Sequence, residues 1–313
     1  MKRLLLPISF LYSIVLFLRH KLYDWKILKS KSYDIPNICV GNLNLGGTGK
    51  TPHIEYLTNL LSENYKIAIL SRGYGRDTKG FILADESHTH HDIGDEPLQY
   101  FKKFKDIKVA VDENRCEGME RLLQEENPPQ VVLLDDAYQH RKIKPSVSVM
   151  LVNYNRPTFK DSLMPIGKLR DLPERTDAAD IIIVSKCPPD LNGWEKSKWA
   201  EALKISNRQH IFFTKTSYDT AVPVFPEGDS RYVYSQKLVL FSGIANDLPL
   251  RHYLSSDYKI VRHLKFPDHH KFSSADIREI EKVARTYPTA VFMTTEKDCQ
   301  RIRDCRKISD NLK

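Results

Sequence analysis

Residues 35–52 read IPNICVGNLNLGGTGKTP, and this stretch decides the fold. An apolar run typical of a buried strand leads into a glycine-rich turn, and a helical pattern begins at Lys50. A strand, a glycine turn, Lys-Thr and a helix in this order form the context that a phosphate-binding P-loop requires. The alternative, a chance glycine turn, leaves the neighbouring strand and helix unexplained. The sequence therefore predicts a P-loop domain.

The residue types of the turn explain how it would bind a nucleotide. Glycines let backbone N–H groups approach phosphate oxygens closely, and the start of the helix adds its positive end. The Lys50 amine would reach the β- and γ-phosphates, and the Thr51 hydroxyl would bind Mg²⁺. Asn44 replaces the first glycine of the usual pattern, which we expect to be tolerated because asparagine accepts left-handed backbone readily. The predicted nucleotide-binding residues are Asn44, Gly46, Gly47, Thr48, Gly49, Lys50 and Thr51.

An acidic pair follows the apolar run at residues 131–136, which read VVLLDD. Four apolar residues followed by an acid are typical of the strand that supplies the metal-binding carboxylate in P-loop enzymes. Asp135 or Asp136 is therefore expected to hold Mg²⁺, directly or through water. The other acid would cap the next element, and the sequence does not say which acid has which role.

Outside these motifs, short apolar runs alternate with helical patterns, which predicts an α/β fold with a parallel sheet covered by helices on both faces. The candidate strands of the first domain are residues 35–40, 66–70, 107–111, 131–134, 147–152 and 181–184, and its candidate helices are 50–62, 115–125 and 194–205. Residues 220–232, TAVPVFPEGDSRY, are typical of a linker or exposed ribbon. A smaller α/β block follows, with strands expected at 238–241, 260–264 and 291–294 and a helix at 274–286.

Composition narrows the function classes. The chain has 313 residues, a formal net charge of +8 and a pI of about 9.0, which predicts an acidic partner such as nucleic acid, an anionic bilayer or a phosphorylated substrate. Its five cysteines are widely spaced and form no C-x-x-C pair. A disulfide framework or a zinc finger is therefore not expected, and a reducing compartment fits best.

The N-terminus carries an apolar run, LLLPISFLYSIVLFL at residues 4–18, with basic residues on both sides. The run is shorter than the roughly 20 apolar residues that a spanning helix needs, and no small-residue cleavage site follows it. We expect a helix that lies in one leaflet with basic residues against anionic headgroups. The alternative is the buried first helix of a soluble domain.

Two P-loop classes are argued against by their missing signatures. Guanine-specific GTPases carry N-K-x-D after a late strand, whereas the equivalent stretch here is IIIVSKCPPD, with Pro188 in place of the aspartate. Partitioning ATPases have a lysine directly before the two glycines, and this chain has Leu45 there. The classes that remain are kinases and ATPases that carry catalytic residues of their own.

At this point the chain resembles one family closely, the tetraacyldisaccharide 4′-kinases of lipid A biosynthesis. The stretches that carry the resemblance occur in family order, cover most of the chain and are jointly specific. They are VGNLNLGGTGKTP (40–52), LSRGYGR (70–76), IGDEP (93–97), LLDDAYQHR (133–141), LMPIGKLRD (163–171), FSGIAN (241–246), FPDHHKF (266–272) and TTEKD (294–298).

The resemblance implies a membrane-associated N-terminal helix at 1–30, a P-loop kinase domain at 31–217, a two-stranded linker at 218–236 and a small C-terminal α/β domain at 237–313. It also implies transfer of the γ-phosphate of MgATP to the 4′-hydroxyl of tetraacyldisaccharide 1-phosphate, which gives lipid IVA. The enzyme would work at the cytoplasmic face of the bacterial inner membrane as a peripheral or monotopic protein. We expect a monomer with no nucleic-acid partner.

The resemblance also assigns residues. Asp95 matches the family's catalytic aspartate and His269 its partner, so that the imidazole would orient the carboxylate that steers the 4′-hydroxyl proton, with Lys50 as the third catalytic residue. Without the resemblance to this family, we would interpret Asp95 as an acidic residue in a turn and His269 or His270 as a histidine on the surface. The resemblance places Arg115, Gln139 and Arg170 near the substrate. Arg72 is a further candidate for a substrate contact.

Two departures from the family qualify these expectations. Asp171 stands where the family usually has glutamate after Leu-Arg, which keeps the carboxylate but shortens the side chain by one methylene. The chain also stops about 15 residues after TTEKD, whereas the family usually continues into another strand. A metal site at His88, His90 and His91 is not expected, because these residues lack helical spacing and a remote ligand.

Two other functions compete with the lipid kinase. One is a soluble P-loop NTPase that acts as a switch or chaperone, and the other is an NTPase that binds nucleic acid, which only the positive charge suggests. Neither has a use for the apolar N-terminal helix. The sequence therefore favours the lipid sugar kinase.

Overall fold

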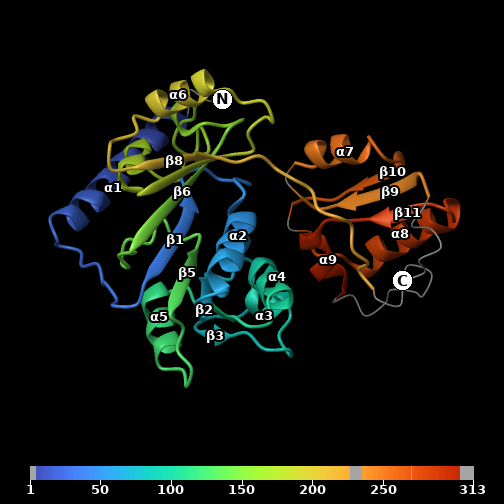
Figure 1. Ribbon diagram of the computed structural model, residues 1–313, viewed down its shortest axis with the longest axis horizontal. Coiled ribbons are helices and arrows are strands. Elements are labelled where there is room, and N and C mark those ends of the chain that lie inside the picture. Colours follow the sequence, from blue (N-terminus) through green and yellow to red (C-terminus); the bar gives the residue numbers. More distant parts are fainter. Residues whose placement is uncertain (1–4, 226–234, 245, 269, 304–313) are drawn as a thin grey trace. The chain divides into compact units, whose positions relative to one another are not determined.

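The computed structural model describes residues 5–225, 235–244, 246–268 and 270–303 (Figure 1). The chain forms two compact units. The first comprises Met1–His88 and Asp92–Tyr218, and the second comprises Thr89–His91 and Asp219–Lys313. Residues 226–234, which form much of the expected linker, lie outside the described part of the chain, as does His269.

The first unit is built on an eight-stranded sheet in the order β3-β4-β2-β5-β1-β6-β7-β8. All neighbouring strands are parallel except β3 and β4, which are antiparallel. The strand bounds are Asn37–Asn42 (β1), Ile67–Ser71 (β2), Ile82–Leu83 (β3), Lys108–Val111 (β4), Val131–Asp135 (β5), Val147–Asn153 (β6), Ile181–Ser185 (β7) and His210–Phe213 (β8). The predicted parallel α/β fold is confirmed.

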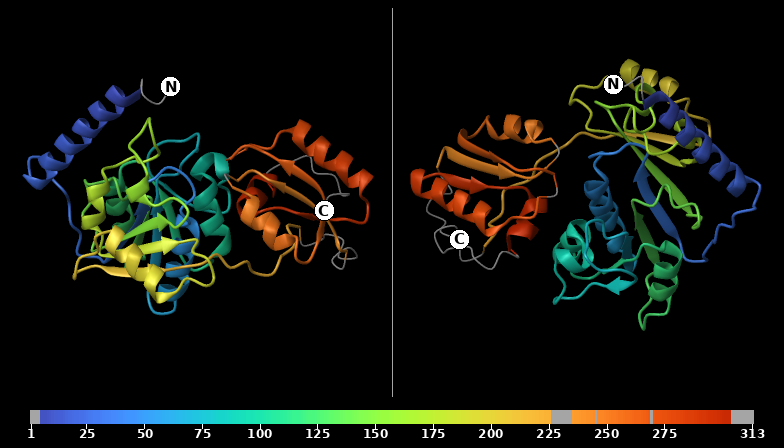
Figure 2. Two further views of the ribbon diagram at one scale, coloured as in Figure 1. Left: turned by 90° about the horizontal axis from the view of Figure 1, so that it is seen from above. Right: turned by 180° about the vertical axis from the view of Figure 1, so that it is seen from behind.

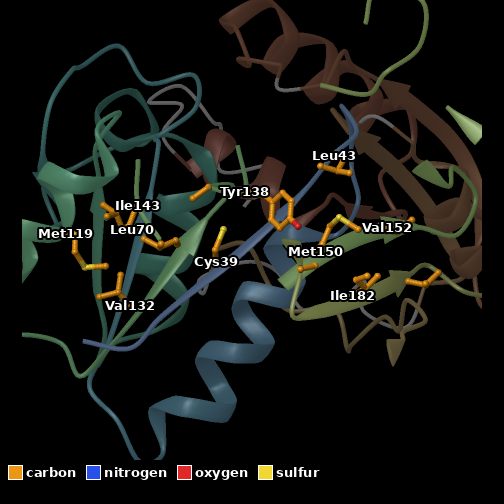
Figure 3. Close-up of a cluster of buried hydrophobic side chains, with 14 of the residues drawn as sticks. Cys39, Leu43, Leu70, Met119, Val132, Tyr138, Ile143, Met150, Val152 and Ile182 are labelled. Carbon is orange, nitrogen blue, oxygen red and sulfur yellow. The ribbon is translucent and has the colours of Figure 1, made fainter. Parts of the chain in front are cut away.

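Helices cover both faces of this sheet because alternate strand residues point to opposite faces. On one face Val40, Ile69 and Leu133 form a core with side chains of α2 and α4. On the other face Cys39, Leu70, Val132 and Met150 form a second core, drawn in Figure 3, with side chains of α5 and α6. The helices of this unit are Leu6–Asp24 (α1), Lys50–Ser62 (α2), Asp95–Lys103 (α4), Arg115–Leu123 (α5) and Gly193–Ala202 (α6), with short 3-10 turns at Thr158–Lys160 (η2) and Pro173–Ala178 (η3). The short helix His90–Ile93 (α3) has residues in both units.

The second unit has a three-stranded parallel sheet in the order β10-β9-β11. Its elements are Lys237–Ser242 (β9), Leu248–Leu254 (α7), Lys259–Lys265 (β10), Ser274–Thr286 (α8), Val291–Met293 (β11) and Glu296–Arg303 (α9). Ser273 and Asp276 form a reciprocal capping box at the start of α8, and Ile277 and Ile280 of that helix are buried against Phe241. The smaller α/β block expected from the sequence is present.

The sequence prediction missed several short elements, of which α4 matters most. Its sequence DEPLQYFKK contains Pro97 and is mainly polar, and the sequence analysis predicted no helix there. Proline is tolerated in the first turn of a helix, where no intrahelical donor is lost. Leu98 and Tyr100 are almost completely buried, and this packing stabilises the helix.

Candidate active site

The carboxyl end of β1 leads into the glycine-rich loop, and α2 begins directly after it at Lys50. Gly46 and Gly49 have φ values of 108° and 89°, in the left-handed region that disfavours any side chain. Gly49 is the N-cap of α2, so the backbone N–H groups at the start of that helix have no intrahelical partners. The strand, the glycine-rich turn and the helix that the pattern predicted are therefore present in this order.

Asn44 does not work in the way that the sequence suggested. Its φ is not positive, so Asn44 does not adopt the left-handed backbone that was given as the reason for tolerating asparagine here. That reason was wrong. The side chain is only 2% exposed and donates from Nδ2 to Asp161 Oδ2 at 3.0 Å. Asn44 also pairs through its backbone with Leu169. Asparagine therefore ties the glycine-rich loop to the segment at residues 161–171.

The Lys50 amine lies at the edge formed by β1 and β5. Its Nζ is 3.4 Å from Asn42 Oδ1 and 3.7 Å from Asp136 Oδ2. Arg170 contacts the same two residues, donating from Nη1 to Asp136 Oδ2 at 3.0 Å, from Nη2 to Asn42 Oδ1 at 2.6 Å and from Nη2 to Asp136 Oδ1. Burial by itself would raise the pKa of Asp136, but the charges of Lys50 and Arg170 outweigh it and hold the pKa below its usual value.

The neighbouring carboxylate of Asp135 has the opposite environment. Asp135 is 1% exposed, and its Oδ2 accepts from the Ser71 hydroxyl at 3.2 Å. Its Oδ1 is buried and has no hydrogen-bond partner in the described part of the chain. Burial, reinforced by the negative charges of Glu96 and Asp136, raises the pKa of Asp135 to about 7. The two acids that the sequence could not tell apart are thus distinct, one paired with cations and one short of a partner.

Asp135 is also the acid that fits a divalent cation. A buried carboxylate oxygen without a partner carries a desolvation cost that a bound cation would remove. The described residues contain no group of three or more His, Cys, Asp or Glu side chains that could hold a metal by themselves. Magnesium in P-loop sites needs no such group, since one carboxylate, one hydroxyl and phosphate oxygens suffice.

The four predicted substrate contacts differ in exposure. Arg115 is 3% exposed and donates to the backbone carbonyls of Asp112 at 3.0 Å and Asp135 at 3.3 Å, and burial lowers the pKa of its guanidinium. Gln139 donates from Nε2 to the Asn42 carbonyl at 2.7 Å. Arg72, directly after β2, is exposed. The carboxyl ends of β1 and β5 are therefore braced by Arg115, Gln139 and Arg170. Arg72 presents its charge to solvent.

Asp95 is the first residue of α4. Gly94 before it has a φ of 90°, and a Cβ there would come within 2.9 Å of the Tyr74 carbonyl oxygen, so only glycine allows the SRGYGR and IGDEP stretches to approach so closely. The charge of Glu96 acts on Asp135, which places the first turn of α4 near the end of β5. The proposed partner of Asp95, His269, lies outside the described residues.

The alternative histidine, His270, has an evident structural role in the second unit. Its Nε2 lies 3.0 Å from Asp276 Oδ2, and its ring stacks on Phe266 with centroids 4.8 Å apart. Gly243 lies beneath it, since a Cβ there would come within 3.3 Å of the His270 Cβ. Asp298 accepts from the Gly243 backbone N–H at 2.9 Å, so three motifs of this unit converge at one place.

Sequence reasoning missed Asn42, Asn153, Ser185 and Lys186, all of which lie around the glycine-rich loop. Ser185 Oγ donates to the Thr48 carbonyl at 2.7 Å, whereas Lys186 Nζ and Asn153 Nδ2 donate to the Gly47 carbonyl at 2.8 and 3.3 Å. Burial lowers the pKa of Lys186. A usable signal existed, because three of the four are the last residues of neighbouring parallel strands, which share one edge of the sheet.

Comparison with known proteins identifies the family. The family model described as tetraacyldisaccharide-1-P 4′-kinase matches residues 1–312. A tetraacyldisaccharide 4′-kinase of Flavobacterium johnsoniae is 43% identical over 310 residues, covering 99% of this chain and 90% of the relative. A protein of the same name from Bacteroides thetaiotaomicron is 41% identical over 323 residues, covering 99% and 85%.

A solved structure is similar over nearly the whole chain. It is the "apo" form of LpxK from Aquifex aeolicus in complex with ATP, which is 28% identical, with a TM-score of 0.76, and covers 97% of this chain and 91% of that one. The sequence motifs, the loop geometry and these relatives agree. The chain belongs to the tetraacyldisaccharide-1-P 4′-kinase family.

Proposed function

We propose that this chain transfers the γ-phosphate of ATP to the 4′-hydroxyl of tetraacyldisaccharide 1-phosphate and so forms lipid IVA. Family membership makes the chain a kinase with an alcohol acceptor. The observation that carries the residue-level proposal is the Lys50 amine at the joint carboxyl edge of β1 and β5, 3.4 Å from Asn42 Oδ1 and 3.7 Å from Asp136 Oδ2. The ATP in the related Aquifex structure supports the choice of nucleotide.

The glycine-rich loop would hold the triphosphate. Backbone N–H groups from Gly46 to Thr51 would be the donors, and the glycines at 46, 47 and 49 have no side chains to block the phosphate. The start of α2 adds a partial positive charge. Lys50 would exchange its contact with Asp136 for the β- and γ-phosphates. Arg170 would keep Asp136 paired when Lys50 turns to the nucleotide, so the Asp136 carboxylate is not left without a cation.

Magnesium would be held by Asp135 and Thr51. When bound, Mg²⁺ neutralises charge on the β- and γ-phosphate oxygens during transfer. Asp135 is favoured over Asp136 because one of its buried oxygens has no partner in the described residues, whereas Asp136 is already paired with Lys50 and Arg170. Ser71 would orient the Asp135 carboxylate through its hydroxyl.

The acceptor side would be served by Asp95, with His269 as the group that orients it. A sugar hydroxyl is a poor nucleophile near neutral pH, so a carboxylate that accepts or steers its proton is needed. The place of Asp95 in the first turn of α4, near the end of β5, supports this role. The exposed guanidinium of Arg72 is our candidate contact for the 1-phosphate, since arginine binds phosphate through two parallel hydrogen bonds.

The acceptor would come from a membrane. Among the described residues, no helix is both long and apolar enough to cross a bilayer. We propose that α1 lies in the cytoplasmic leaflet of the inner membrane, with basic residues against anionic headgroups. The net charge of +8 on the whole chain favours such a surface. The enzyme would then act as a monomeric peripheral or monotopic protein.

The test is transfer of label from γ-labelled ATP to tetraacyldisaccharide 1-phosphate in detergent micelles. The unaltered chain should form labelled product with Mg²⁺ and lose this activity with excess EDTA. Lys50→Ala and Asp95→Ala should abolish or strongly reduce transfer. Lys66→Ala is the matched control, because Lys66 is exposed at the opposite, amino end of β2 and should leave the rate unchanged. ATP hydrolysis that is indifferent to the lipid would contradict the proposal.

A further inference from the structure

Helix α1 has its polar and apolar faces exchanged relative to a helix on the surface of an ordinary globular domain. Its buried residues, Ser9, Leu16, His20 and Tyr23, recur every three to seven positions and include three with polar groups. The apolar side chains on the outer face are each more than half exposed. They are Leu6, Ile8, Phe10, Leu11, Val15, Phe17 and Leu18. Figure 2 shows α1 as a separate rod along the outside of the first unit.

The buried face of α1 is hydrogen-bonded to one segment, residues 161–171. Ser9 Oγ donates to the Leu163 carbonyl at 3.1 Å, and the Tyr12 hydroxyl donates to the Arg170 carbonyl at 2.8 Å. His20 Nε2 lies 2.6 Å from Asp171 Oδ1, and both side chains are buried. Three contacts over three turns of helix therefore fix both ends of the segment.

The same segment is joined to the glycine-rich loop on its other side. The Leu45 backbone N–H donates to the Lys168 carbonyl at 2.7 Å, and the Arg170 N–H donates to the Leu43 carbonyl at 2.8 Å. The Arg170 side chain contacts Asp136, which is the acid next to Lys50. Arg170 is thus held through its carbonyl by α1 and presents its guanidinium to the phosphate site.

A second connection runs from α1 through Gln139. Arg19 Nη2 donates to the Gln139 carbonyl at 2.8 Å, and the Gln139 side chain donates to the Asn42 carbonyl at 2.7 Å. Arg141, two residues further on, donates to the His20 carbonyl at 3.0 Å. Both connections end at Asn42, whose side-chain oxygen contacts Lys50.

We propose that Tyr12 and His20 are positioning residues for phosphoryl transfer. Their contacts with residues 161–171 fix the backbone of Arg170. The Arg170 guanidinium in turn positions the Asp136 carboxylate, which lies next to the Lys50 amine. The membrane-facing helix is then a structural part of the phosphate site, so a shift of α1 at the bilayer changes nucleotide binding. A helix that serves only as an anchor would have no need of three side-chain contacts to the segment that carries Arg170. The inference rests on the proposed function for its kinetic readout, but its nucleotide-binding readout is independent of the acceptor.

The test uses Tyr12→Phe, which removes one hydroxyl and keeps the ring. We expect about a five- to ten-fold weaker affinity for ATP by isothermal titration calorimetry and a similar fall in kcat, the range that one lost hydrogen bond supports. The KM for the lipid in micelles and flotation with anionic vesicles should stay within about two-fold of the unaltered chain, because the outer face is unchanged. Ser13→Ala is the matched control on the same helix, since Ser13 Oγ donates to the Phe10 carbonyl of α1 itself.

A second pair of variants separates positioning from simple folding. Glutamine at position 20 can still donate to Asp171, whereas leucine cannot, so His20→Gln should keep ATP affinity within about three-fold and His20→Leu should lose about ten-fold. If His20→Leu fails to fold, Tyr12→Phe still decides the question. Unchanged ATP affinity in Tyr12→Phe, or in a folded His20→Leu, overturns the proposal. Normal ATP binding by the unaltered chain with no transfer to the lipid would instead overturn the proposed function and leave this inference standing.

Discussion

The carboxyl edge of β1 and β5 and the buried face of α1 both place polar side chains away from water, but they do so differently. At the strand edge, Lys50, Asp135, Asp136 and Arg170 form a charge cluster. One buried carboxylate oxygen there has no partner among the residues that the structure describes. At α1, Ser9 and Tyr12 donate to backbone carbonyls, and His20 contacts Asp171. The first region is a cluster of charged groups beside the glycine-rich loop. In the second region most polar groups pair within the protein, although Asp171 Oδ2 is also buried without a partner in the described residues.

The difference predicts that mutations in the first region lower activity, whereas mutations in the second region lower stability. A region arranged for a ligand carries strain that is relieved when the ligand binds, so removing a charge there costs activity more than stability. A region that pairs most of its polar groups within the protein stabilises the fold, so removing one partner leaves the other buried and costs stability first. Each prediction below tests this contrast, from the largest expected effect to the smallest.

The largest effect is expected for Lys50→Ala. Loss of the amine should lower kcat for transfer to tetraacyldisaccharide 1-phosphate by about 10³-fold, because a preorganised cation at the transferring phosphate is lost. The free energy of unfolding should change by less than about 1 kcal/mol, since Arg170 still pairs with Asp136. Micellar kinetics and urea denaturation measure the two quantities. A loss of stability as large as the loss of activity would contradict the contrast.

Asp135→Asn should lower activity by about 10²-fold and stabilise the chain in the absence of divalent ions. Burial and two neighbouring acids raise the pKa of Asp135 to about 7, above the value of about 3.9 for an unfolded chain. Folding therefore favours the protonated acid, and the stability this contributes is complete below about pH 4 and is lost as the pH rises through 7.

The asparagine variant does not titrate. In EDTA, its advantage in unfolding free energy over the unaltered chain should grow from pH 4 to pH 7, by at most about 4 kcal/mol, and stay constant above about pH 8. Thermal or urea unfolding across this range measures it. Asp136→Asn is the comparison, because cations hold the pKa of Asp136 low and its removal should destabilise the fold at neutral pH. An advantage that shrinks as the pH rises would refute the assignment.

Asp171→Ala probes the α1 side of the contrast. It leaves His20 buried without its partner, which should cost about 3 kcal/mol of stability, while kcat of the protein that remains folded falls by about ten-fold. Denaturant unfolding and kinetics at low temperature separate the two effects. Little change in stability together with a large loss of activity would place Asp171 in the ligand region instead.

The smallest effect on the fold is expected for Phe10→Ser. Phe10 is 68% exposed on the outer face of α1, so the free energy of unfolding should change by less than about 0.5 kcal/mol. Binding to anionic vesicles should weaken by about ten-fold, because a large apolar side chain no longer enters the lipid. Vesicle flotation measures this. Unchanged partition would refute the membrane role of the outer face.

Much of the candidate site could be predicted from motifs. The strand, the glycine turn and Lys50-Thr51 are consecutive, so their geometry follows from local backbone preferences. The pair Asp135–Asp136 was found for the same reason, because a strand that ends in an acid is a local pattern. The function of Asn44 was not predictable, since its partner Asp161 is 117 positions away. Helix α4 was missed because its stability comes from the burial of Leu98 and Tyr100 rather than from its own propensity.

The sequence by itself determined the P-loop, the parallel α/β fold, the apolar N-terminal helix and the family, since all depend on residue order over short stretches. Only the tertiary structure decided which acid is paired and which is left with a free oxygen, and that Tyr12 of α1 contacts the segment carrying Arg170 across 158 positions. The physical reason is that hydrogen-bond partners and burial depend on how distant segments pack together. Those contacts set the pKa of Asp135 and the place of Arg170, and no local pattern records them.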